Sequence, residues 1–393
     1  MSSTAETFSL DPSIKFMGTS PTAVMENHRT LTASSSKARP DRSTKPSASA
    51  APAGAGLTTR LILVGLVVLL IAGGVLFVRV MLHRGPAVDQ SPSSRPIPDR
   101  YDGDRAMGYL KKLCEFGPRP SGSDAMIRQQ RYLESFFRER GAEVTRQDFE
   151  TRNPNDGSAM TMTNLIASWH PDRPIRFLFC AHYDTRPYPD RDRQNPKGTF
   201  IGANDGASGT AGLMELSNQL DDLPDDIGID MVLFDGEEFV WVENRDRYFL
   251  GSTFYAQTYR QSPPQVPFRA GVLFDMIGDK ELKLYYEMNS IRYAKPVAQS
   301  FWQVAKRLRV DAFVPKTRHD LRDDHLPLNQ IAKIPTIDVI DFDYPRPGIG
   351  SPSYWHTEND IPENCSGESI AAVVWVAHQW VLAQSRSKRN TSR

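Results

Sequence analysis

Several short segments of the chain combine apolar residues with side chains that can bind a metal ion or move a proton. The clearest is Asp235-Gly236-Glu237-Glu238, which directly follows the apolar run Ile229–Phe234. Adjacent side chains at a strand end point in different directions, so one glutamate can bind a metal while its neighbour acts on substrate as general base or acid. Two carboxylates after a buried strand are unfavourable unless a positive charge lies nearby. A solvated turn is the alternative interpretation.

Three further segments carry candidate residues. In His182-Tyr183-Asp184 the imidazole can bind a metal while the carboxylate orients it, although an ordinary polar loop explains the tripeptide equally well. Asp205 lies in the glycine-rich loop GANDGASG near the start of a predicted helix, and an Asn-Asp-Gly turn with a helix cap is the alternative. Asp275 lies within an apolar stretch, where a buried aspartate needs a metal, a hydrogen-bond network or a substrate ammonium group as its partner.

Two segments nearer the C-terminus complete the set. Asp323-Asp324-His325 opens an amphipathic stretch, and its paired acids are also typical of a helix N-terminus. Trp355 and His356 follow a loop, residues 344–352, that is rich in Pro and Gly and long enough to form a pocket rim, with Trp355 as its hydrophobic wall. Carboxylate and imidazole ligands together suit Zn²⁺ with one position open for substrate.

The composition excludes other classes of function. The chain has 393 residues, with 47 basic and 47 acidic side chains and a formal net charge of zero. Without a basic field, nucleic acid is not expected as a partner. The three cysteines are too few for a disulfide framework and too far apart in the sequence for an obvious metal site.

Strand and helix signals alternate along most of the chain. The predicted strands are mostly unbroken apolar runs, which are typical of a sheet buried on both faces: Thr163–Trp169, Arg176–Ala181, Ile229–Phe234, Gly271–Phe274 and Pro335–Ile340. The predicted helices are Ala106–Phe116, Asp124–Arg140, Gly209–Leu220, Ala294–Leu308 and Gly367–Ala383. This alternation predicts one α/β domain with helices on both sides of a central, mostly parallel mixed sheet, and active sites of such sheets gather at the carboxyl ends of the strands.

The N-terminal part has a different character. Residues 1–56 are rich in Ser, Thr, Ala and Pro and are expected to be disordered. Leu61–Val78 then contains eighteen residues without a charge, which is long enough to cross a bilayer. A buried core helix is seldom apolar on every face over this length, and a signal peptide would lie nearer the start and have a shorter apolar run. We therefore expect a transmembrane helix in residues 57–82, a linker in 83–100, a catalytic domain in 101–385 and a basic tail in 386–393.

The charges that flank the apolar run indicate an orientation. Five basic residues precede it and four follow within a similar distance. This small excess places the N-terminus inside and predicts a single-pass membrane protein with an extracytoplasmic catalytic domain.

In this order the motifs resemble the zinc-dependent exopeptidase family of the bacterial leucyl aminopeptidases and, within it, the animal-type glutaminyl-peptide cyclotransferases. The resemblance covers most of the chain from Phe116 to the last predicted helix. It rests on the segments HYD at 182–184, GANDGASG at 202–209, DGEE at 235–238, LGS at 250–252, DMIG at 275–278, DDH at 323–325 and WHT at 355–357.

The resemblance implies a role for each matching residue. Zn²⁺ would be bound by Asp205, Glu238 and His356, and Glu237 would be the proton shuttle. In the aminopeptidase branch a second zinc is bound by His182 and Asp275, with the first aspartate as the bridge. In the cyclase branch those two residues persist but one zinc is kept, so the ligands alone do not separate the two branches.

Other positions favour the cyclase branch. Trp355, directly before a ligand histidine, and the DDH segment are similar to the cyclases, in which Asp323 and Asp275 would help to hold the substrate and the proton relay. Trp355, Trp241 and His325 are the expected substrate-binding residues. The cyclases place a pocket tryptophan five residues after the ligand glutamate, and here that position is Glu243. Cys180 matches one half of the animal enzymes' disulfide, but no second cysteine follows nearby.

The apolar run and the resemblance together predict a membrane-anchored glutaminyl cyclase that converts the N-terminal glutamine of peptides or proteins to pyroglutamate and releases ammonia. A di-zinc aminopeptidase that releases N-terminal residues is the first alternative. A catalytically inactive binding ectodomain on a membrane stalk is the second, and the intact set of ligands together with Glu237 argues against it.

Overall fold

The computed structural model describes residues 95–342 and 354–385. The predicted disordered region, membrane span and basic tail lie outside these residues, as do most of the predicted linker and the Pro- and Gly-rich loop at 344–352. Among the described residues, no helix has both the length and the apolar character needed to cross a bilayer.

A six-stranded sheet forms the centre of the domain, with the strand order β1-β2-β4-β3-β5-β8. Three of its pairings are parallel, β4 with β3, β3 with β5 and β5 with β8, and the two pairings at the β1 edge are antiparallel. The predicted mostly parallel mixed sheet is therefore confirmed. The strands are β1 Glu143–Arg152, β2 Ala159–Trp169, β3 Ile175–His182, β4 Ile227–Phe234, β5 Phe268–Asp275 and β8 Thr336–Ile340.

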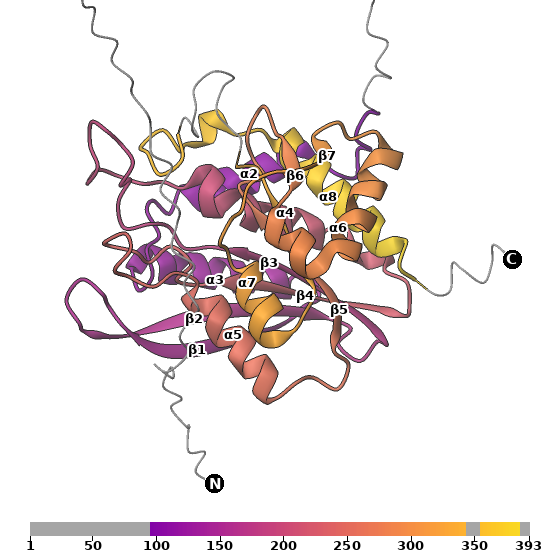
Figure 1. The fold of residues 1–393 in the computed structure, drawn as a ribbon, viewed down its shortest axis with the longest axis horizontal. Helices are drawn as coiled ribbons and strands as arrows, with labels where there is room; N and C mark the ends of the chain where they lie inside the picture. Colours follow the sequence, from indigo (N-terminus) through magenta and orange to yellow (C-terminus); the bar gives the residue numbers. More distant parts are fainter. Residues whose placement is uncertain (1–94, 343–353, 386–393) are drawn as a thin grey trace, which may run out of the picture. The chain divides into compact units, whose positions relative to one another are not determined.

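Helices cover both faces of this sheet, as Figure 1 shows. One face carries α2 Gly103–Cys114, α3 Asp124–Arg138, α4 Gly209–Ser217, α6 Met288–Leu308 and α8 Gly367–Leu382. The other face carries α5 Leu250–Gln261, the short α7 His325–Pro327 and the helical turn η3 Leu328–Ala332. A second, two-stranded sheet is formed by β6 Leu284–Tyr286 and β7 Phe313–Thr317.

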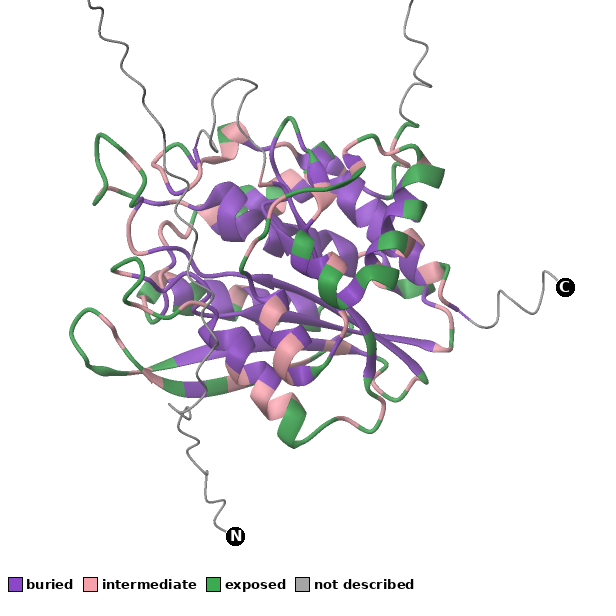
Figure 2. Ribbon diagram, in the orientation of Figure 1, coloured by how far each residue is buried: buried purple, intermediate pink, exposed green. Residues whose placement is uncertain are grey.

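The central strands are largely buried (Figure 2), and their side chains divide between two cores, one on each face of the sheet. In β3, Phe177 and Phe179 belong to the larger core under α4 and α8, whereas Leu178 and Cys180 belong to the smaller core under α5 and η3. This is the period of two that a strand imposes on its side chains. Because both faces are covered by helices, the strand must be apolar throughout, which explains the unbroken apolar runs in the sequence.

Two differences from the predicted elements have physical causes. Strand β1 is absent from the predicted strands because Phe149 is its only buried residue, so the strand has no apolar pattern. Helix α6 begins at Met288 instead of Ala294, because the Glu287 side chain caps its N-terminus by accepting hydrogen bonds from two backbone amides. The backbone is kinked at Ala294, two residues before Pro296, which lacks the amide hydrogen that a regular helix needs.

Strands β4, β3 and β5 are adjacent in the sheet, and this brings three candidate segments to one edge. Strand β3 ends at His182, β5 ends at Asp275, and β4 is followed by Asp235-Gly236-Glu237-Glu238. Because these strands are parallel, their carboxyl ends lie at the same edge. The sheet topology alone therefore places these side chains near one another.

Helix α4 approaches the sheet so closely that its first residue must lack a side chain. A Cβ atom on Gly209 would lie 2.2 Å from the Phe274 carbonyl oxygen of β5. We expect Gly209→Ala to lower the free energy of unfolding by roughly 1–3 kcal/mol through overpacking. Urea unfolding followed by circular dichroism measures this.

Gly108 provides the matched control, because it lies exposed in α2 and a Cβ atom there would have no neighbouring atom within 4 Å. Gly108→Ala is expected to raise the free energy of unfolding by about 0.5–1 kcal/mol, since alanine is the better helix former. Equal unfolding midpoints for the two variants would contradict the close approach of α4.

Candidate metal centre

Among the described residues, three buried groups of side chains bring possible metal ligands together. In each group one ligand atom from every residue lies within 4.8 Å of the others. The groups are Asp205 with Glu238 and His356, His182 with Asp205 and Asp275, and Asp323 with His325 and Asp338. All of the predicted metal ligands fall in the first two groups.

The first group consists of the three residues predicted to bind zinc. His356 Nε2 lies 2.7 Å from Glu238 Oε1 and 3.4 Å from Asp205 Oδ2. The other oxygen of Glu238 is buried without a hydrogen-bond partner. These residues come from three separate segments of the chain, so only the folded domain brings them together.

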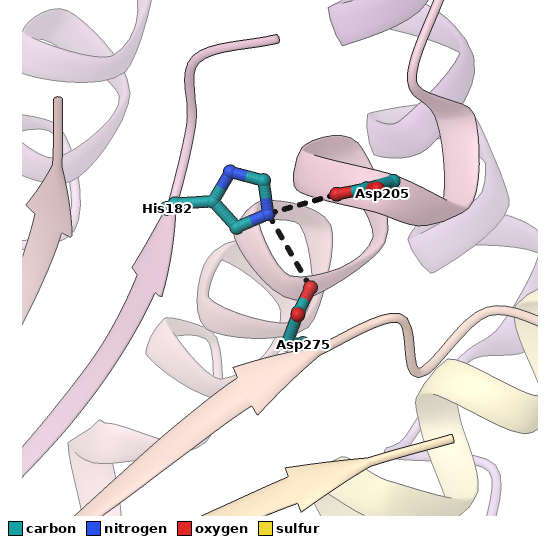
Figure 3. A group of neighbouring side chains, drawn as sticks. All are labelled: His182, Asp205 and Asp275. Atoms are coloured by element: carbon teal, nitrogen blue, oxygen red, sulfur yellow. Dashed lines mark ion pairs between the residues drawn. The ribbon is translucent and has the colours of Figure 1, made fainter. Parts of the chain in front are cut away.

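The second group shares Asp205 with the first (Figure 3). His182 Nε2 lies 3.1 Å from Asp205 Oδ1 and 3.3 Å from Asp275 Oδ1. One oxygen of the Asp205 carboxylate therefore faces His182 and the other faces His356. This is the arrangement of a bridging carboxylate between two adjacent sites.

The loop that carries Asp205 is held in a conformation that requires glycine. Gly206 has a φ of +94°, and a Cβ atom there would lie 2.7 Å from the Asp184 carbonyl oxygen and 3.2 Å from the His182 ring. The carboxylate of Asp360 accepts hydrogen bonds from the backbone amides of Asn204 and Asp205, at 2.7 and 3.0 Å. These constraints fix the position of the Asp205 side chain.

Asp184 supports the glutamate pair. Its two carboxylate oxygens accept hydrogen bonds from the backbone amides of Glu237 and Glu238, at 3.2 and 3.0 Å. The carboxylate lies 3.6 Å from His182 Nδ1, which is too far for a good hydrogen bond. The sequence predicts that Asp184 orients His182; the structure pairs the two side chains and shows that Asp184 also holds the turn that presents the two glutamates.

The pKa shifts in the first group and at the adjacent Glu237 reflect a buried excess of carboxylates. Burial raises the pKa of Glu237 well above its usual value, and burial together with Asp205 raises the pKa of Glu238. Burial opposes protonation of His356, but Glu238, Asp190 and Asp205 raise its pKa to about 10. A buried excess of carboxylates favours the binding of either protons or a metal ion.

The donor atoms fit Zn²⁺. Buried nitrogen and oxygen atoms without a hydrogen-bond partner occur at His182, Glu238 and Asp275. Imidazole nitrogen and carboxylate oxygen are ligands that zinc binds in catalytic sites. Because an orphaned buried polar atom is costly, these atoms are well suited to bind an ion.

The DDH segment contributes Asp323 and His325 to the third buried group and is not a solvated helix N-terminus. Asp323, Asp324 and His325 are all 4% exposed or less. His325 lies 3.3 Å from Glu287 Oε2 and 3.7 Å from Asp338 Oδ2. Its side chain is fully buried between these two acids, and its contact with a substrate stays a prediction. Sequence reasoning missed both acids, although an aspartate in the apolar run of β8 was a possible signal.

The two predicted substrate-binding tryptophans lie in different surroundings. The ring of Trp355 lies 4.0 Å from that of His356 and has the Arg191 guanidinium 4.0 Å above it. Trp241 packs edge-on against Tyr188, and its buried indole nitrogen has no hydrogen-bond partner. Trp355 is therefore directly beside a candidate ligand.

All three cysteines are described and all are free. Cys180 is buried in β3, where it contributes to the apolar core. The sequence-based expectation that disulfides do not carry the fold agrees with this arrangement.

Comparison with known proteins identifies the family. The sequence model of peptidase family M28 matches residues 164–381, which is more than half of the chain and includes every candidate residue of the first two groups. The chain belongs to peptidase family M28. The resemblance seen in the motifs, to zinc-dependent exopeptidases and their cyclase relatives, is thereby confirmed.

Solved structures related to this M28 protein include both kinds of relative. The glutaminyl cyclase of Fimbriiglobus ruber is 38% identical, with a TM-score of 0.68, over 72% of this chain and 96% of that one. A Zn-dependent exopeptidase from Parabacteroides distasonis is 32% identical, with a TM-score of 0.66, over 74% of this chain and 100% of that one.

A curated relative is more distant. The glutaminyl-peptide cyclotransferase of Gloydius blomhoffii is 26% identical over 253 residues, which are 56% of this chain. The chain spans 65% of the length of that relative.

Removal of metal should destabilise this M28 protein, because the buried carboxylates would then lose their counter-ion. Zinc at about 100 times its Kd should add about 2.7 kcal/mol to the free energy of unfolding of the chelator-treated protein. Thermal unfolding with and without zinc measures the shift.

His356→Ala is expected to lose most of this shift. His170→Asn is the matched control, because His170 is an exposed histidine in a turn with positive φ, a conformation that asparagine accepts. An unchanged melting temperature of the wild-type protein on adding zinc would argue against a metal centre.

Proposed function

We propose that this M28 protein is a zinc-dependent glutaminyl-peptide cyclotransferase. It would convert N-terminal glutamine of peptides or proteins to pyroglutamate and release ammonia. The observation that carries the proposal is the complete buried set Asp205, Glu238 and His356, with Glu237 next to it and Trp355 at its side. The likeness to the Fimbriiglobus ruber glutaminyl cyclase over almost its full length supports the same activity.

The three residues of the first group would hold the zinc ion. When bound there, zinc supplies Lewis-acid polarisation of the substrate's γ-carboxamide oxygen. One zinc is expected for a cyclase. The protein's own contribution is to exclude water and to hold the glutamine side chain and the α-amine close together, since an intramolecular attack is favoured by proximity.

Glu237 is suited to move the proton. Its side chain is 11% exposed, compared with 5% for Glu238, so it is the more accessible of the two glutamates. Burial raises its pKa well above the usual value, which brings a carboxyl group closer to the range in which it exchanges protons near neutral pH. In the proposed reaction it accepts a proton from the attacking α-amine and passes it to the departing ammonia.

Other residues would support this transfer. Asp275 and Asp323 are both buried. Burial is the main cause of the raised pKa of Asp323, and the negative charges of Asp338, Asp275 and Glu237 raise it further. They would brace the proton relay, while Trp355 packs against the glutamine side chain. The buried His325 would act through the acids beside it.

A di-zinc aminopeptidase is the second candidate. The group formed by His182, Asp205 and Asp275 favours it, because these residues resemble a second metal position that shares a bridging aspartate with the first. In that reaction Glu237 would activate water for attack on the first peptide bond. Two zinc ions per chain would be expected.

Mass spectrometry of a Gln-initiated peptide incubated with the purified full-length chain separates the two activities. We expect a product lighter by one ammonia. Loss of the entire first residue would instead support the peptidase.

Glu237→Gln is the matched variant in this assay. It keeps the size of the side chain and all three zinc ligands, so we expect normal zinc content with turnover reduced roughly 10²- to 10⁴-fold. Wild-type turnover in this variant would rule out the proposed role of Glu237.

We also propose that a single-pass helix within residues 57–82 anchors the protein in a membrane, with the catalytic domain outside the cytoplasm. The long uncharged run and the small excess of basic residues before it support this. The full-length chain should remain in the membrane pellet after an alkaline wash, and a variant without residues 57–82 should be released. Protease added to intact cells should cut the domain, and complete protection would contradict the orientation.

A further inference from the structure

Arg186 is a buried cation next to the first ligand group that neither the motifs nor the proposed reaction uses. Its side chain is 2% exposed. It follows β3 by four residues, in the loop after His182. Burying a guanidinium costs free energy unless its donors are hydrogen-bonded, so the residues that accept from Arg186 indicate its structural role.

Those partners lie on several segments. Arg186 Nε and Nη2 donate to the two carboxylate oxygens of Asp190, at 2.8 and 3.1 Å. Nη2 also donates to Glu243 Oε2 at 2.9 Å and to the Tyr248 hydroxyl at 3.1 Å. Nη1 lies 3.5 Å from Glu238 Oε1, the oxygen that faces His356. The planar fork of arginine thus joins one candidate zinc ligand to residues outside the ligand group.

Asp190 connects the same guanidinium to the second ligand. His356 Nδ1 lies 3.1 Å from Asp190 Oδ1. A histidine that binds zinc through Nε2 carries its proton on Nδ1, and a carboxylate that accepts this proton fixes both the tautomer and the ring orientation. Because Arg186 holds both oxygens of Asp190, it determines where that carboxylate lies.

We propose that Arg186 is a positioning residue for zinc, which holds Glu238 directly and His356 through Asp190. The inference rests on the zinc site of the proposed function but not on which reaction that site performs. Glu243 is part of the same arrangement. At the position where the resemblance leads one to expect a pocket tryptophan, this chain has a carboxylate that binds Arg186.

The test is the affinity of the full-length chain for the metal alone. Arg186→Gln, after removal of metal with a chelator, is expected to bind Zn²⁺ roughly 10- to 100-fold more weakly than the wild type in competition with a chromophoric chelator. The absorption bands of the Co²⁺-substituted protein should also shift, because they report the ligand geometry. Zinc affinity and Co²⁺ bands equal to those of the wild type would overturn the proposal.

Arg176→Gln is the matched control. Arg176 is a buried arginine near the start of β3 that pairs with Asp230 at 2.5 Å, away from the carboxyl edge of the sheet. Its loss should lower the free energy of unfolding and leave zinc affinity unchanged. If both variants weakened zinc binding equally, Arg186 would have only a general structural role and the proposal would fail.

Two further variants keep the test decisive if Arg186→Gln does not fold. Arg186→Lys keeps the charge but not the fork, so zinc binding should still be weaker than in the wild type. Asp190→Asn changes a side chain that is 39% exposed, and a roughly 10-fold loss of zinc affinity is expected. Wild-type affinity in both would overturn the proposal. A wild-type chain that binds zinc but does not cyclise a Gln-peptide would overturn the proposed function and leave this inference standing.

Discussion

The rest of the centre depends on the contacts of the Asp205 carboxylate, which joins the first two ligand groups. Its two oxygens face two histidines that lie far apart in the sequence, His182 and His356. Asp205 can occupy that place only because Gly206 adopts a positive φ and Asp360 holds the backbone amides of the loop. The surrounding fold concentrates negative charge at one edge of a buried sheet, and such charge is stable only with a positive partner.

Sequence reasoning recovered those parts of the molecule that leave a local pattern. The strands β3, β4, β5 and β8 are apolar runs because both faces are buried, and the acids at their carboxyl ends stand out against that background. Strand β1 left no such pattern, because Phe149 is its only buried residue. Arg186 and Asp190 were missed for a related reason: in a polar loop their types are unremarkable, and their role exists only through contacts across the fold.

The relation between the two candidate activities also follows from the geometry. Both need the group of Asp205, Glu238 and His356, and both need a glutamate beside it. The neighbouring group with His182 and Asp275 shares Asp205 with the first group. The same constellation can thus support attack by the substrate's own amine or attack by water.

The loop after β3 has a consequence for how this part of the chain can vary. It contacts the segment around His356 through Asp190, through the Arg191 amide, which donates to the His356 carbonyl at 3.1 Å, and through Asp192, which accepts from the Glu358 amide. The loop after β3, which is distant in the sequence, therefore holds the segment that carries this histidine. Substitutions in the loop after β3 can therefore displace this ligand, although that loop contributes no member of the first group.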